Sequence, residues 1–228
     1  KDVPMHLPPG FTLAATLERA DPRDAFVSNQ FRSLAEMPAG TRVGTSSLRR
    51  ECQLRANFPQ LVIEPLRGNV QTRLRKLDEG QYGAIILAAA GLKRLGLAER
   101  IAALLTPEES LPAVGQGALG IECREDRSDV FELLVPLVHS PTRQCVLAER
   151  AFSRALAGSC NVPLAGFAEI ASGQLRLRGL VGAPDGSLVI RGEAAGTPDA
   201  AEAVGLTLAA DLKGRGAADI LVALAQQS

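Results

Sequence analysis

Short apolar runs alternate with amphipathic segments through the first half of the chain. The runs at 25–27, 61–66 and 82–88 are apolar at successive positions, which is typical of strands buried on both faces. The amphipathic segments at 48–57 and 70–79 are predicted as helices. Such an alternation of strand and helix is the signature of a parallel α/β sheet. Further strands are predicted at 11–16, 42–44 and 118–123, and a short helix at 92–95.

The pattern changes after about residue 140. A long amphipathic stretch at 142–157 predicts a helix. Turn sequences at 172–173 and 184–186 then separate short apolar segments, which predicts antiparallel strands. The strands are predicted at 167–170, 174–181 and 188–193 and a last helix at 199–213, after which the segment 217–225 closes the chain. These elements predict a separate, smaller α+β domain.

Composition excludes several classes of protein. The 228 residues include 25 Lys and Arg against 25 Asp and Glu, so a generally basic nucleic-acid binder is not indicated. With 46% hydrophobic residues, wholesale disorder is also excluded. No apolar run is long enough to span a bilayer, no leader peptide is recognisable, and the four cysteines form no CxxC pair. We therefore expect a cytoplasmic protein without a metal site or disulfides.

Charge is nevertheless uneven along the chain. Residues 41–95 carry ten Lys and Arg and four Asp and Glu, a net charge of +6 that the remainder balances. A local basic field in a neutral protein favours an anionic small molecule over a polymer as the ligand.

The cations gather where predicted strands pass into helices. The segment 44–50 combines a glycine, three hydroxyl residues and a helix start with Arg49 and Arg50, and a helix N-terminus favours an anion. Arg67 and Arg73 flank the next junction, and Lys93-Arg94 the third. All three junctions lie at the carboxyl edge of the predicted sheet, where open α/β sheets bind ligands. Ordinary capped helices with solvated arginines remain an alternative at this point.

Two further residues are candidates for chemistry. Asp2, ahead of Val3-Pro4, is a candidate acid or charge stabiliser, or else a solvated carboxylate. Cys160 lies in a tight loop at 158–163, where a thiol is either exposed and reactive or a small buried apolar group. The other three cysteines are predicted to pack in the core, and the two histidines receive no role: Cys52, Cys123, Cys145, His6 and His139.

Seven segments together resemble the porphobilinogen deaminase family, also called hydroxymethylbilane synthases, and the likeness extends along the whole chain in order and spacing. The segments are Lys1-Asp2-Val3-Pro4, Asp21-Pro22-Arg23-Asp24-Ala25, Gly44-Thr45-Ser46-Ser47-Leu48-Arg49-Arg50, Leu66-Arg67-Gly68-Asn69-Val70, Ala89-Ala90-Gly91-Leu92-Lys93-Arg94-Leu95-Gly96, Pro112-Ala113-Val114-Gly115-Gln116-Gly117 and Gly158-Ser159-Cys160-Asn161-Val162-Pro163. The family's first domain begins well before the first of these segments. We therefore expect this chain to lack that part and to be inactive by itself.

The resemblance implies an activity. Family members are cytoplasmic transferases that join four porphobilinogen molecules head to tail into hydroxymethylbilane, with release of ammonia, in tetrapyrrole and haem biosynthesis. By motif, Cys160 bears a dipyrromethane cofactor through a thioether, and Asp2 is the catalytic aspartate. The resemblance also implies two sets of carboxylate-binding residues: Lys1, Ser47, Arg49, Arg50 and Arg67 for the cofactor, and Arg73 and Arg94 for the substrate.

The resemblance implies a fold as well. The family fold has two α/β domains with parallel or mixed sheets, like the lobes of type II periplasmic binding proteins, and a smaller C-terminal α+β domain. The expected division is 1–20 with 112–137 as the remaining part of domain 1, 21–111 as domain 2, and 138–228 as domain 3. We expect a monomer whose partner is porphobilinogen, with no nucleic acid, membrane or metal. The alternative is a non-enzymatic lobe that binds a small polycarboxylate or phosphate.

Overall fold

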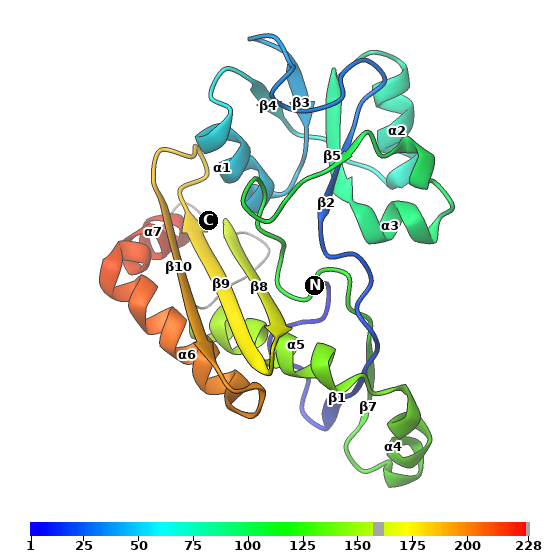
Figure 1. Cartoon of the computed structure of the whole chain (residues 1–228), viewed down its shortest axis with the longest axis vertical. Helices are drawn as coiled ribbons and strands as arrows, with labels where there is room; N and C mark the ends of the chain where they lie inside the picture. The colour runs from blue at the N-terminus through cyan, green and yellow to red at the C-terminus, as the bar shows by residue number, and fades with distance from the viewer. Residues whose placement is uncertain (157–161, 227–228) are drawn as a thin grey trace.

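Three sheets make up the β-structure of the computed structural model, which describes residues 1–156 and 162–226. A five-stranded sheet lies at one end of the long axis and a two-stranded sheet at the other, with a three-stranded sheet beside them (Figure 1). The chain is therefore α/β with a C-terminal α+β part, as predicted.

The five-stranded sheet is mixed rather than parallel. Its order is β4-β3-β5-β2-β6, in which β3 runs parallel to β4 and β5, whereas β2 runs antiparallel to β5 and β6. The parallel sheet predicted from strand–helix alternation is thus wrong for β2, because no helix connects it to a neighbour. Asp24 begins β2 and pairs with Ala88 at the end of β5, so β2 starts at the carboxyl edge of the parallel strands. The strands are β2 (Asp24–Val27), β3 (Arg42–Gly44), β4 (Val62–Glu64), β5 (Ala84–Ala88) and β6 (Ala103–Leu104).

Helices cover both faces of this sheet. Phe26 and Ile86 belong to the apolar cluster that includes Leu54 of α1, whereas Ile85 packs with Leu74 of α2 on the other face. This is why β5 reads as a continuous apolar run. The helices α1 (Leu48–Asn57), α2 (Val70–Asp78) and α3 (Ala89–Arg94) follow β3, β4 and β5. The first two helix predictions are confirmed to within one residue.

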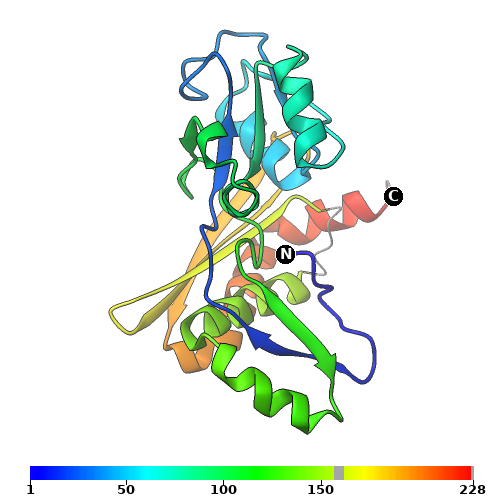
Figure 2. The same cartoon turned by 90° about the vertical axis from the view of Figure 1, so that its right-hand side faces the viewer.

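The C-terminal elements also agree with the predicted pattern. The antiparallel sheet β10-β9-β8 packs α5 and α6 against one face and contacts α1 on the other (Figure 2). Cys52 of α1 reaches that second face, where it packs against Phe167 and Leu180. The elements are α5 (Ser140–Ala155), β8 (Leu164–Ala171), β9 (Gln174–Gly182), β10 (Val189–Gly196), α6 (Ala201–Leu212) and α7 (Ala218–Ala225). None of the helices among the described residues is long and apolar enough to cross a membrane.

Two chain segments, 17–23 and 105–119, connect the two-stranded sheet to the five-stranded one. This sheet pairs β1 (Phe11–Thr16) antiparallel with β7 (Gly120–Arg124), and α4 (Ser128–Leu134) lies beside it. The connecting segments run antiparallel to each other, since Leu17 donates to the Leu119 carbonyl and Ala20 to the Gly117 carbonyl. The three-domain division given above stays a prediction.

Gly117 lies where the two segments run side by side, and its replacement by alanine should destabilise the fold. Its φ is +84°, and an added Cβ would lie 2.6 Å from the Ala20 carbonyl oxygen. The matched control is Gly40→Ala, since Gly40 has a φ of +80° with open space around it. We expect the control to lose about 1–2 kcal/mol of unfolding free energy from backbone strain alone, and Gly117→Ala to lose more. Urea denaturation measures both, and equal losses would contradict the predicted close approach.

Candidate active site

Two adjoining cavities lie between the carboxyl edge of the five-stranded sheet and the segment 1–6. The larger has a volume of about 680 Å³ and the smaller about 300 Å³. The two cavities share five lining residues: Lys1, Asp2, Arg50, Arg73 and Gln116. The larger cavity is also lined by Ser47 and Arg49, and the smaller by Arg94. The three strand–helix junctions identified in the sequence therefore contribute to one site, through β3, β4 and β5.

Arg49 and Arg50, here termed the arginine pair, lie in the first turn of α1 and are 5% and 6% exposed. Ser47 is the N-cap residue, but its hydroxyl makes no capping hydrogen bond among the described residues. The predicted hydroxyl cap is therefore absent at Ser47, and the residue lines the larger cavity instead. At the second junction Asn69 caps α2, because its side chain accepts from the Thr72 amide at 2.8 Å.

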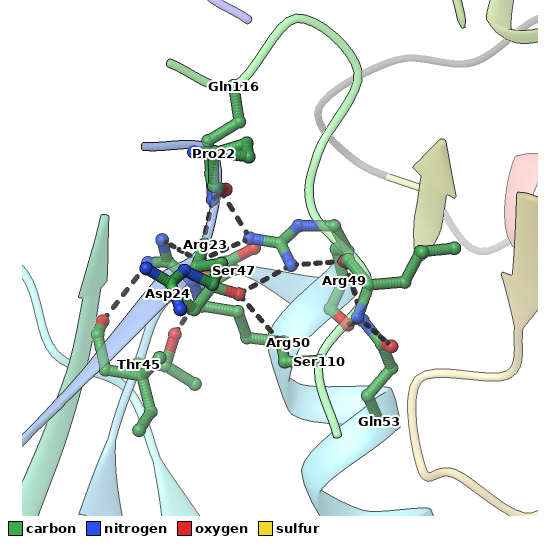
Figure 3. Close-up of polar contacts among 12 residues, drawn as sticks. Pro22, Arg23, Asp24, Thr45, Ser47, Arg49, Arg50, Gln53, Ser110 and Gln116 are labelled. Carbon is green, nitrogen blue, oxygen red and sulfur yellow. Dashed lines mark hydrogen bonds and ion pairs between the residues drawn. The ribbon is translucent and has the colours of Figure 1, made fainter. Parts of the chain in front are cut away.

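The arginine pair converges on one buried carboxylate (Figure 3). Asp24 is fully buried and accepts from Nη1 and Nη2 of Arg49 at 2.8 and 3.1 Å. It also accepts from Nε and Nη2 of Arg50 at 3.0 and 2.7 Å. Ser110 and Gln116 donate to the same carboxylate at 2.7 and 3.0 Å. The sequence pattern predicted that an anion binds at this helix start. The structure shows that Asp24 of the protein itself provides one negative charge there.

Charge explains why this cluster stays ionised. Burial alone would raise the pKa of Asp24, but Arg49 and Arg50 offset it and hold that pKa well below its usual range. Asp24 therefore contributes stability that is present above its unfolded pKa of about 4 and is lost only in strong acid. Burial lowers the pKa of Arg50, and Asp24 partly restores it.

One buried donor of the arginine pair has no acceptor. Among the described residues, Nε of Arg49 is the buried side-chain nitrogen that makes no hydrogen bond. A buried unpaired N–H costs about 1–3 kcal/mol, so an acceptor from a ligand would be favoured there. Two guanidinium groups facing one carboxylate also leave the cluster with one unbalanced positive charge. An anion with carboxylate oxygens suits both features.

The remaining cations face the same space. Arg73 of α2 is half-buried and donates its Nε to the Gly68 carbonyl at 2.7 Å, whereas Arg94 at the end of α3 is exposed. Lys1 is open to solvent on one side, yet desolvation at the cavity wall lowers the pKa of its side chain. In the part of the chain that the structure describes, the walls of the two cavities carry five cationic side chains and one carboxylate, that of Asp2.

Two candidate residues are not placed at the cavities. Arg67 is exposed on the loop after β4 and lines neither cavity, while its carbonyl accepts from Lys76. Cys160 lies outside the described residues, so the structure does not place it. Of the cysteines predicted to pack in the core, Cys52 and Cys145 are buried, whereas Cys123 is only half-buried.

The sequence pattern did not single out Asp24 as a candidate residue of this site. A signal was present, because an acid that leads directly into the apolar strand 25–27 has to find a buried partner. It also missed Glu149 of α5, which is fully buried and binds Arg19 through both carboxylate oxygens at 2.6 and 3.1 Å. Glu149 further accepts from the Gly115 amide at 2.6 Å, so it joins both connecting segments to α5.

Comparison with known proteins decides the family. Residues 1–132 match the family model described as porphobilinogen deaminase, dipyromethane cofactor binding domain, and residues 143–214 match the porphobilinogen deaminase C-terminal domain. The chain belongs to the porphobilinogen deaminase family. It is 66% identical to the porphobilinogen deaminase of Nitrosomonas europaea over 99% of this chain and 73% of that protein. It is 62% identical to that of Chromobacterium violaceum over 98% of this chain and 72% of that protein.

This membership confirms the predicted activity class. The porphobilinogen deaminase family polymerises porphobilinogen into hydroxymethylbilane in tetrapyrrole synthesis and uses a dipyrromethane cofactor. The alternative of a non-enzymatic binding lobe is not favoured.

Solved structures show a looser likeness. A YaeC-family lipoprotein of Enterococcus faecalis overlaps with 56% of this chain and 62% of its own at 16% identity and a TM-score of 0.39. A putative methionine-binding lipoprotein of Bacillus subtilis overlaps with 57% and 62% at 11% identity and a TM-score of 0.40. Overlaps of this size carry no information on a ligand.

Proposed function

We propose that the two cavities form the active site at which four porphobilinogen molecules are joined, with Asp2 as the catalytic carboxylate. The buried arginine pair carries the proposal, because it lines the cavities together with three further cations, Lys1, Arg73 and Arg94, and the described residues offer Nε of Arg49 no acceptor. Each pyrrole unit brings an acetate and a propionate, so a growing chain needs many cationic contacts. The direct test is the consumption of porphobilinogen and the appearance of hydroxymethylbilane with the purified full-length protein. No consumption by a folded, cofactor-loaded protein would refute the proposal.

The residues present fit a dipyrromethane in this site. Its carboxylates suit the unpaired Nε of Arg49 and the unbalanced charge of the arginine pair. We assign Lys1, Ser47, Arg49 and Arg50 to hold it, and Arg67 if the exposed loop after β4 turns inward. When bound, the cofactor supplies a pyrrole with a free α-carbon to which the first porphobilinogen unit is added.

Asp2 is suited to the charge that develops during the reaction. Loss of ammonia from porphobilinogen leaves positive charge near the pyrrole nitrogen, and a fixed carboxylate beside that N–H stabilises it. Among the described residues that line the two cavities, Asp2 is the one that carries a carboxylate. In our proposal the protonated side chain of Asp2 first gives its proton to the amine, which departs as ammonia, and the carboxylate that remains stabilises the cation.

Arg73 and Arg94 are assigned to the incoming substrate. They line the smaller cavity from α2 and α3, next to Asp2. By pairing with the acetate and propionate of porphobilinogen they hold the reacting carbon near the end of the growing chain, which supplies the entropic part of catalysis.

Cys160 is proposed to bear the cofactor, by its motif rather than by its placement. Peptide mapping of the holo-protein should find the added dipyrromethane mass on the peptide that contains Cys160. Cys160→Ser should give a folded protein without that mass, because an alcohol is a far weaker nucleophile than a thiolate. Added mass on the peptides of Cys52, Cys123 or Cys145 would contradict the assignment.

We further propose that the protein is a cytoplasmic monomer that acts on this small molecule without nucleic acid or membrane. Its zero net charge and three described thiols without disulfide partners support this. Sedimentation equilibrium should give the mass of one chain, and a dimer would contradict it.

A further inference from the structure

Asp24 lies at the start of β2, directly behind the two arginines that line the cavities. It is the first residue of β2 and pairs with Ala88, the last residue of β5. The antiparallel direction of β2 therefore brings this carboxylate to the carboxyl edge of β3, below the first turn of α1. There it accepts six hydrogen bonds from four side chains, so both oxygens are fully occupied by protein donors.

We propose that Asp24 is a positioning residue, which holds the arginine pair in place at the walls of the two cavities. The inference rests on the function proposed above for the pair. A guanidinium has five N–H groups. The bonds of Arg49 to Asp24, Gln116 and the Leu111 carbonyl occupy its terminal nitrogens, and no described residue accepts from its Nε–H. Those of Arg50 to Asp24 and the Ile86 carbonyl leave one N–H on each terminal nitrogen.

Asp24 also sets the charge that a ligand meets. With it, the arginine pair has a net charge of +1, which one ligand carboxylate neutralises. Without it, two adjacent buried guanidinium groups would repel each other and turn toward solvent, away from the geometry that a ligand needs. The cluster thus separates two tasks: Asp24 orients the cations, and the free N–H groups bind.

Gln116 fixes the arrangement to the connecting segments. Its side-chain nitrogen donates to Asp24 at 3.0 Å and to the Pro22 carbonyl at 2.6 Å, while its oxygen accepts from Arg49 at 3.4 Å. Pro22 lies just before β2, in the other connecting segment. The side-chain amide of Gln116 therefore links the orientation of the arginine pair to the pairing of the two connecting segments.

The test compares Asp24→Asn and Asp24→Glu with the control Ser110→Ala. The control removes one hydrogen bond to the same carboxylate and leaves both arginine contacts in place. Two quantities are measured on each protein: dipyrromethane content by intact mass, and unfolding by urea.

We expect Ser110→Ala to be less stable but fully loaded with the cofactor. Asp24→Asn should lose about tenfold or more of its cofactor content, since it loses the charge that holds two buried cations. Asp24→Glu keeps the charge but displaces it, and should fall between the two.

Specific outcomes overturn the inference. Full cofactor content in Asp24→Asn, or in Asp24→Glu if the asparagine variant does not fold, would show that the arginine pair does not need Asp24. An equal loss of cofactor in Ser110→Ala would show that Asp24 acts through stability alone. A wild-type protein without dipyrromethane would refute the proposed function itself, which distinguishes that failure from the failure of this inference.

Discussion

Replacing Asp2 by asparagine should lower the turnover of porphobilinogen by about 10²–10³-fold, the usual cost of a lost electrostatic stabiliser. The substitution keeps the size of the side chain but removes the negative charge from the walls of the cavities. Since Asp2 is exposed and the arginine pair is untouched, the free energy of unfolding and the cofactor content should not change. Steady-state rates and urea unfolding of the purified full-length protein, together with its intact mass, measure these quantities.

A matched control accounts for the change in net charge. Glu132→Gln removes one exposed carboxylate from α4, away from both cavities, and should leave turnover unchanged. If Asp2→Asn turns over porphobilinogen at the rate of this control, Asp2 has no part in the chemistry.

Replacing Arg49 by leucine should both destabilise the fold and prevent cofactor loading. The change leaves Asp24 buried with a single cationic partner and strips the Leu111 carbonyl of a donor at 2.8 Å. Breaking a buried ion pair from one side costs about 3–5 kcal/mol. Because Nε of Arg49 is lost as well, we expect the folded fraction to be apo-protein. Arg50→Leu should behave similarly, since it leaves Asp24 with Arg49 alone.

Denaturant unfolding and intact mass check this prediction against Arg75→Leu. Arg75 lies on α2 with a 69% exposed side chain and a 3.7 Å contact to Glu79, so its loss should cost about 0–1 kcal/mol and leave the cofactor in place. An Arg49→Leu protein with full cofactor content and unchanged stability would refute the assigned role of the arginine pair.

Local sequence determined most of the secondary structure. The helices α1 and α2 were predictable because apolar positions recur with helical spacing and each helix follows a strand end. The apolar run of β5 indicated a strand buried on both faces, and the packing of Ile86 and Ile85 on opposite sides of the sheet confirms it. The grouping of arginines at three junctions was also visible, since strands and helices that alternate bring their junctions to one sheet edge.

Only the tertiary structure decided which groups meet at that edge. The antiparallel direction of β2 depends on where the chain enters from the two-stranded sheet, and it puts Asp24 beside Arg49 and Arg50. Sequence periodicity reports on contacts within one turn or one strand, whereas these partners are 25 and 26 residues apart. The segment that carries Asp2 depends still more on distant contacts, since Arg150 of α5 donates to the carbonyls of residues 3–5. The family motif identified the residue types, and long-range packing determined which of them face a ligand and which hold one another.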